Sequence, residues 1–110
     1  MSFSEGLVLV IHSLTKDKKW KKIDRHKEIC EKLNKIYTAK NKDYGDSFSE
    51  GFQEYGLIMP AIRLEDKLRR YKQLIKQDAE VKDESIIDTL LDLANYSIMT
   101  IIEIENRDKE

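Results

Sequence analysis

A chain of 110 residues that is 40% hydrophobic and 37% charged is long enough for one domain with a modest core. Its formal net charge of −1 gives no general attraction to nucleic acids or to anionic membranes. The single cysteine, Cys30, excludes an internal disulfide, and few glycines and prolines beside abundant Lys, Glu, Leu and Ile predict an all-α fold.

We expect one helical domain over residues 1–110, a small bundle of four to five helices. Its N-terminal part, residues 1–22, is predicted to form a helix followed by a lysine-rich link. Residues 7–11 alone could form a buried strand, but the sequence offers no second strand to pair with it. This apolar segment could also contact another subunit. It is too short for a membrane span and lacks a basic leader, so we expect a cytoplasmic protein without a membrane partner.

The next part of the chain is predicted to form two helices joined by a polar turn. The apolar pattern indicates a helix over about residues 23–41, with Asp24 as its N-cap. A short helix that Asp46 or Ser47 can cap should follow and run through Tyr55. The turn between them, residues 40–48, reads Lys-Asn-Lys-Asp-Tyr-Gly-Asp-Ser-Phe and carries more polar chemistry than a helix–helix turn requires.

Two long antiparallel helices are predicted at the centre of the bundle, over about residues 59–77 and 83–105. Pro60 suits the first turn of the earlier helix, and Asp83 or Ser85 can cap the later one. Because a short loop joins the two helices, they should pack side by side.

The later helix carries acids among apolar residues. At 100° per residue one stripe holds six of its side chains: Glu84, Asp88, Asp92, Asn95, Met99 and Ile102. A solvated face would stay polar along its length, whereas this stripe becomes apolar in its second half. We therefore expect the acids to point inward, where an unpaired carboxylate is costly and a cation must neutralise it.

The earlier helix supplies cations that could meet these acids. Arg63, Lys67 and Arg70 share a polar sector with Asp66, and Glu65 lies on the other flank of the apolar stripe. Inward acids from neighbouring helices can form a metal site, and oxygen ligands without Cys or paired His favour Mg²⁺ or Mn²⁺. Two interpretations stay open: a metal site completed by substrate phosphates, or a buried network of salt bridges between the acids and these cations.

Three ordered motifs resemble those of a known family. They are residues 40–48, residues 63–70 (Arg-Leu-Glu-Asp-Lys-Leu-Arg-Arg) and residues 88–96 (Asp-Thr-Leu-Leu-Asp-Leu-Ala-Asn-Tyr). They resemble the nucleotide modification associated domain, type 1. The resemblance covers roughly residues 24–104, and it implies a small phage or bacterial protein linked to nucleotide metabolism or to modification of DNA bases.

The architecture is similar, more distantly, to the all-α nucleoside triphosphate pyrophosphatases of the MazG-like and dimeric dUTPase group. That similarity implies acids on two adjacent helices that hold Mg²⁺, cleavage between the α- and β-phosphates, and a homo-oligomer. Glu65 and Asp66 would stand in the first acidic motif, and Asp88 and Asp92 in the second. The sequence departs from that pattern in the four-residue spacing of the second pair and in Lys67, which replaces an expected carboxylate.

These arguments predict a set of site residues with three kinds of role. The predicted metal ligands are Glu65, Asp66, Glu84, Asp88 and Asp92, and Asp88 and Asp92 would also be catalytic. The predicted phosphate ligands are Lys40, Lys42, Arg63, Lys67 and Arg70. The residues predicted to contact the nucleotide or its base are Asp43, Tyr44, Asp46, Ser47, Phe48, Asn95 and Tyr96.

We consider three hypotheses of function. The first is a Mg²⁺-dependent pyrophosphohydrolase, or a close relative, that acts on a small nucleotide as a dimer or tetramer. The second is a nucleotide-binding protein without catalysis, such as a sensor, a sequestering protein or an accessory to a modification enzyme. The third is a helical interaction protein whose polar network is structural.

Overall fold

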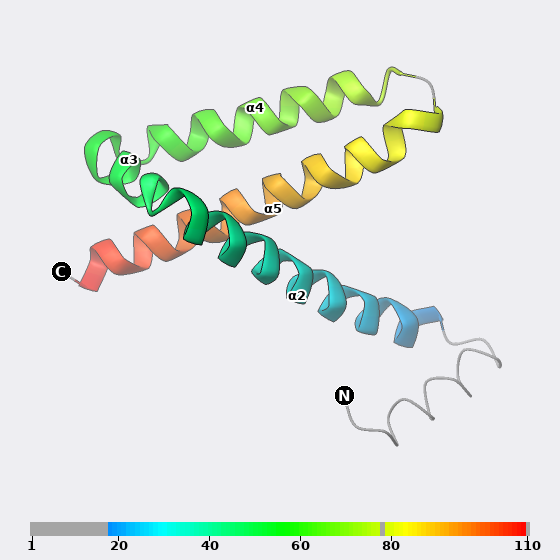
Figure 1. The fold of residues 1–110 in the computed structure, drawn as a ribbon, viewed down its shortest axis with the longest axis horizontal. Helices are drawn as coiled ribbons and strands as arrows, with labels where there is room; N and C mark the ends of the chain where they lie inside the picture. Colours follow the sequence, from blue (N-terminus) through cyan, green and yellow to red (C-terminus); the bar gives the residue numbers. More distant parts are fainter. Residues whose placement is uncertain (1–17, 78, 110) are drawn as a thin grey trace. The chain divides into compact units, whose positions relative to one another are not determined.

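The computed structural model of the chain describes residues 18–77 and 79–109, without the side chains of residues 18–20, 43, 44 and 79–82. Helices dominate this part of the chain, which confirms the all-α prediction (Figure 1). They are α2 (Lys18–Tyr44), α3 (Ser47–Tyr55), α4 (Ile58–Leu74) and α5 (Ala79–Lys109). The N-terminal helix predicted before the lysine-rich link lies outside the described residues.

Two compact units divide the chain at the end of α2. They are Met1–Ile36 and Tyr37–Glu110. The second unit contains the last turns of α2 together with α3, α4 and α5. Every feature of the candidate site lies in this second unit.

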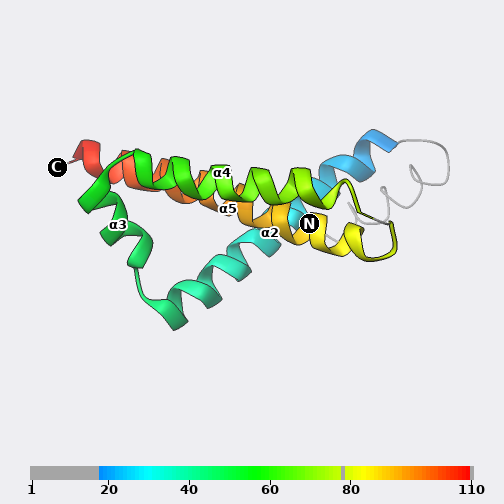
Figure 2. The same cartoon turned by 90° about the horizontal axis from the view of Figure 1, so that it is seen from above.

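The pair formed by α4 and α5 is the centre of the second unit. The two helices run antiparallel and lie side by side, as predicted, with α3 on one side of them (Figures 1 and 2). Pro60 is fully buried in the first turn of α4. A backbone N–H in this turn has no intrahelical acceptor, so proline, which lacks the N–H, costs the helix no hydrogen bond there. Leu74 and Leu91 are buried as well, so apolar burial along both helices stabilises this pair.

Two helix boundaries differ from the prediction. Because α2 begins at Lys18, Lys18, Lys19, Lys21 and Lys22 belong to the helix and not to a link, and Asp24 is not a cap. Because α5 begins at Ala79, Asp83 and Ser85 lie inside that helix. Both extensions consist of residues that form helices readily, with no glycine or proline to stop them.

Glycines stand in the turns on both sides of α3, and the turn before α3 is shorter than the predicted turn over residues 40–48. Gly45 and Gly56 have φ angles of 70° and 71°, a region that side chains with a Cβ atom rarely adopt. The N–H of Gly56 donates to the carbonyl of Phe52 at 2.7 Å and so ends α3. Phe52 itself is buried. The hydroxyl of Ser49 donates to the carboxylate of Glu103 at 2.8 Å and connects α3 to α5.

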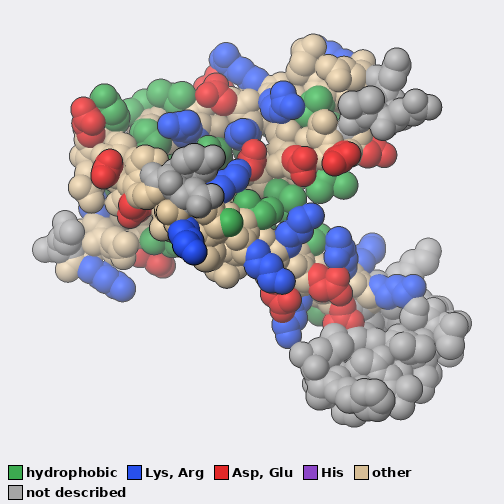
Figure 3. Space-filling model, in the orientation of Figure 1, with side chains coloured by type: hydrophobic (Ala, Val, Ile, Leu, Met, Phe, Trp, Pro, Cys, Tyr) green, Lys and Arg blue, Asp and Glu red, His purple; other side chains and the backbone are tan. Residues whose placement is uncertain are grey.

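Much apolar surface remains uncovered in the described part of the chain. From Asp83 to Lys109, α5 is long and apolar enough to cross a membrane by length and composition alone, and 11% of its most apolar 18-residue window is buried. Core helices of soluble proteins meet the same criterion. Hydrophobic side chains also reach the surface at the start of α4, where Leu57 and Ile58 are exposed (Figure 3).

Candidate functional site

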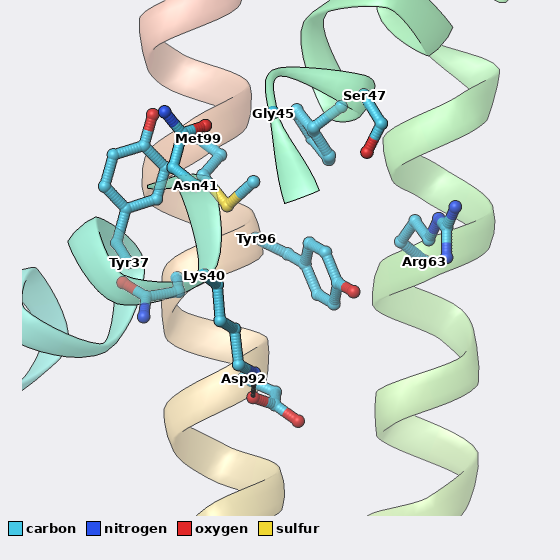
Figure 4. A pocket seen from close by; sticks show the side chains of 11 residues that line it. Tyr37, Lys40, Asn41, Gly45, Ser47, Arg63, Asp92, Tyr96 and Met99 are labelled. Atoms are coloured by element: carbon cyan, nitrogen blue, oxygen red, sulfur yellow. Dashed lines mark hydrogen bonds and ion pairs between the residues drawn. The ribbon is translucent and has the colours of Figure 1, made fainter. Parts of the chain in front are cut away.

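A pocket opens where the end of α2, the start of α3 and the facing sides of α4 and α5 come together (Figure 4). Its cavity volume is about 180 Å³. Pockets that enclose a whole drug-sized ligand have volumes of about 300 to 1,000 Å³, so this one suits a part of such a ligand. Eleven residues line it: Tyr37, Lys40, Asn41, Gly45, Ser47, Phe48, Arg63, Asp92, Asn95, Tyr96 and Met99.

An aromatic pair forms one part of the pocket wall. The rings of Phe48 and Tyr96 are stacked, with centroids 5.9 Å apart and an angle of 24° between their planes. Tyr96 extends from α5 into the space between α5 and α4. Tyr37 lies on the other side of α5, away from α4 (Figure 4). A flat, apolar group with a π face is the kind of ligand that such a surface prefers.

Asp92 is the acid of the pocket, and two lysines neutralise it. The ammonium group of Lys40, near the end of α2, lies 3.3 Å from Oδ1 of Asp92, and that of Lys67 on α4 lies 3.1 Å from Oδ2 (Figure 4 shows the first pair). Lys67 and Asp92 are about three-quarters buried, whereas Lys40 is largely exposed. Both carboxylate oxygens are therefore engaged, and one acid links three helices.

Arg63 supplies a further positive charge from α4. Its guanidinium lies across the pocket from the wall formed by α2 and α5 (Figure 4). Among the residues whose side chains the structure describes, none forms an ion pair with Arg63, while Arg69 on the same helix is paired with Glu65. With Lys40 and Lys67 on either side of Asp92, the pocket and its border carry more positive than negative charge.

The start of α3 adds backbone donors to this positive region. Ser47 and Phe48, the first two residues of α3, both line the pocket. The first N–H groups of a helix have no intrahelical acceptor, and the side chain of the N-cap residue Asp46 does not cap them. A helix N-terminus of this kind favours an anion.

The structure brings together part of each predicted group except the metal ligands. Of the residues predicted to contact the nucleotide, Ser47, Phe48, Asn95 and Tyr96 line the pocket. Asp46 is exposed and is not among the lining residues. The predictions for Asp43 and Tyr44 concern side chains outside the described part of the chain.

The predicted phosphate ligands divide in the same way. Lys40 and Arg63 line the pocket. Lys67 lies at its border, where its ammonium group forms an ion pair with Asp92. Lys42 and Arg70 are exposed and do not line it.

The expectation of inward-pointing acids is correct for Asp92 and wrong for Glu84 and Asp88, which are exposed. The stripe lies on a flank of α5, and the end of α2 and the start of α3 cover that flank only in its second half. Asp66 is exposed and lines a separate apolar hollow beside Ile62. In the described part of the chain, no three acidic, histidine or cysteine side chains lie close enough together to hold a metal ion.

Sequence reasoning missed four lining residues, Tyr37, Asn41, Gly45 and Met99. A signal was present, because Tyr37, Lys40 and Asn41 are three and four residues apart and so share a helix face. Lys40 fell in both the predicted helix over about residues 23–41 and the predicted turn over residues 40–48, and it lies within the last turns of α2.

Comparison with known proteins gives one match. No curated protein and no solved structure matches the chain. The more distant similarity to pyrophosphatases is not tested by these comparisons and stays a prediction. Residues 40–104, which contain α3, α4 and all the pocket residues except Tyr37, match the family described as nucleotide modification associated domain 1. The chain therefore belongs to the nucleotide modification associated domain 1 family.

Proposed function

We propose that the pocket binds a small nucleotide, with the base against Phe48 and Tyr96 and a phosphate on Arg63. The observation that carries the proposal is that one pocket contains both a stacked aromatic pair and an arginine. That arginine has no acidic partner among the described side chains. A nucleotide joins a flat aromatic group to an anion at a short distance. The family name supports the same class of ligand.

The charges around Asp92 favour an anion over a bare cation. An incoming metal ion would have to displace the ammonium groups at 3.3 and 3.1 Å, whereas a phosphate would be attracted by Lys40, Lys67 and Arg63 together. The N–H groups at the start of α3 add to this attraction.

Magnesium-dependent hydrolysis stays a prediction. Mg²⁺ commonly binds through one or two carboxylates together with substrate phosphates, so it could arrive with the nucleotide. The described acids do not fit a resident metal, because both oxygens of Asp92 are engaged by lysines and Glu65 is paired with Arg69. We therefore route no catalytic step through a metal, and binding is the function proposed.

Titration calorimetry with deoxynucleoside mono-, di- and triphosphates, with and without Mg²⁺, tests the proposal. Arg63→Gln should weaken nucleotide binding by about 10- to 150-fold, because a charge-assisted hydrogen bond contributes about 1.5–3 kcal/mol. Arg70→Gln is the matched control, since it removes the same charge from an exposed position of α4 outside the pocket. It should change affinity by less than about threefold.

Equal losses in the two variants would show a general electrostatic effect and contradict a site at Arg63. Absence of binding by every nucleotide would contradict the proposal entirely. The same samples can be analysed for released pyrophosphate or phosphate, and turnover that Asp92→Asn abolishes would establish the hydrolysis prediction.

A further inference from the structure

The charged side chains of the pocket determine how many phosphate groups it can neutralise. Among the side chains that the structure describes, Lys40, Arg63 and Asp92 are the charged residues of the lining, and Lys67 lies at the border. Three cations and one carboxylate leave a net charge of +2. A phosphate monoester carries a charge of about −1.5 to −2 at pH 7. One terminal phosphate therefore balances the charge of the pocket.

Other cations of α2 and α4 do not extend this charge within the pocket. Arg69 is paired with Glu65, and Lys42 and Arg70 are exposed and do not line the pocket. A second or third phosphate would each add about one negative charge without a further described cation in the lining. Pairs between exposed charges contribute only about 0–1 kcal/mol, because water and salt screen them. The described charges thus favour one phosphate over three.

The carboxylate of the pocket does not favour a triphosphate with its metal ion. Mg²⁺ that is bound to phosphates usually takes one or two protein carboxylates as further ligands. Asp92 is the one carboxylate among the described lining residues, and its oxygens lie 3.3 and 3.1 Å from two lysine ammonium groups. A metal ion would have to separate these ion pairs. A single phosphate needs no metal ion and can accept hydrogen bonds from Arg63 directly.

The size of the pocket also favours a ligand with one phosphate. Its cavity volume is about 180 Å³, whereas sites that enclose a drug-sized ligand have volumes of about 300 to 1,000 Å³. The pocket therefore suits the smallest nucleotide that still joins a base to an anion. Phe48 and Tyr96 form an aromatic wall for the base, and Arg63 faces the pocket from α4 (Figure 4). A nucleotide with one phosphate supplies a partner for each of these groups.

We propose that the pocket selects nucleoside monophosphates, bound without a metal ion, over di- and triphosphates. This inference rests on the proposed function, because it assumes that the pocket binds a nucleotide. A monophosphate contains no phosphoanhydride bond, so the reactions open to this ligand are at its base, its sugar or its phosphate ester. A pyrophosphohydrolase would instead require the triphosphate as its ligand.

Titration calorimetry in EDTA at about 0.15 M salt compares the common deoxynucleosides with their 5′-mono-, di- and triphosphates. For the base that binds most tightly, the monophosphate should bind about 10- to 150-fold more tightly than the deoxynucleoside, because it adds a charge-assisted hydrogen bond. The di- and triphosphate should bind no more tightly than the monophosphate, within about threefold. A repeat with Mg²⁺ should leave this order unchanged.

Arg63→Gln tests whether the phosphate preference comes from the pocket. It should lower the affinity for the monophosphate by about 10- to 150-fold, whereas the affinity for the deoxynucleoside, which has no phosphate, should change far less. Arg70→Gln removes the same charge from an exposed position outside the pocket and should change both affinities by less than about threefold. Circular dichroism confirms that both variants remain helical.

The possible failures separate this inference from the proposed function. A di- or triphosphate that binds more than about threefold more tightly than the monophosphate, with or without Mg²⁺, would overturn the inference and leave the proposed function intact. Equal losses of monophosphate affinity in the two variants would show a general electrostatic effect and contradict both. A monophosphate that binds no more tightly than its deoxynucleoside would contradict both, as would the absence of binding by every ligand.

Discussion

At the scale of single residues, the contacts of Asp92 bear on the two uses of acids that the sequence left open. Its oxygens contact Lys40 and Lys67, so the described structure contains the ion pairs of the network interpretation, with one lysine from α2 in addition to the expected cation of α4. The helical wheel identified the acid correctly. It could not identify Lys40, because 52 residues separate the two side chains in the sequence.

Asp92→Asn should therefore have opposite effects on stability and on ligand binding. Loss of the carboxylate leaves two ammonium groups without their partner and should lower the free energy of unfolding by about 1 kcal/mol, discounted for the exposure of Lys40. The same change removes the negative charge from an anion site and should tighten phosphate binding severalfold. Urea unfolding and calorimetry with a nucleoside monophosphate measure the two effects. Weaker binding, restricted to solutions with Mg²⁺, would instead identify Asp92 as a metal ligand.

Thr89 illustrates a residue whose burial the sequence pattern did not indicate. It is 3% exposed, and its hydroxyl donates to the carbonyl of Ser85 at 2.8 Å within α5. A threonine that satisfies its hydroxyl inside its own helix can be buried at little cost. The side of α5 that contains Thr89 is therefore buried, and the flank with Glu84 and Asp88 remains exposed at that end.

At the scale of elements, the turn between α3 and α4 depends on a conformation that other residues rarely adopt. Gly56 has φ 71° and ψ −154°, a combination essentially restricted to glycine. Gly56→Ala should lower the free energy of unfolding by about 1–3 kcal/mol through backbone strain, although an added Cβ would meet no atom within 4 Å. Thermal and urea unfolding, followed by circular dichroism at one protein concentration, measure this change.

Gly51→Ala is the control for that substitution. Gly51 lies inside α3, where alanine favours the helix by up to about 1 kcal/mol, and the added Cβ would meet the flexible Met59 side chain, whose Cε lies at 3.2 Å. The net effect should be small. Equal destabilisation in both variants would contradict the importance of the φ angle at Gly56.

The elements themselves could be predicted from periodicity, and their ends could not. The apolar spacing of residues 59–77 and 83–105 predicted α4 and α5 as an antiparallel pair, because that spacing reports which side of a helix is buried. The start of α5 at Ala79 could not be read from capping residues, since Asp83 and Ser85 are equally compatible with a helix interior. The prediction of the pocket was incomplete for a related reason. The pocket forms where α2, α3 and α5 meet, and a local sequence pattern does not show which helices meet in the fold.

At the scale of the whole molecule, few apolar side chains are buried in the described part of the chain. They are Leu33, Phe52, Pro60, Leu74 and Leu91. Many isoleucines and leucines of α4 and α5 are instead about half exposed. These described elements therefore gain little free energy of folding from apolar burial.

If the chain forms the homo-oligomer that the resemblance implies, its melting temperature should depend on protein concentration. For a dimer that unfolds to two chains, a hundredfold increase in concentration contributes about 2.7 kcal/mol. The unfolding entropy of twice 110 residues, at about 2.1 cal/mol/K per residue, is about 0.46 kcal/mol/K, so the melting temperature should rise by about 6 °C. Scanning calorimetry between 1 and 100 μM measures the rise. A melting temperature of the wild type that stays constant over this range would contradict the homo-oligomer and would mean that each chain folds alone.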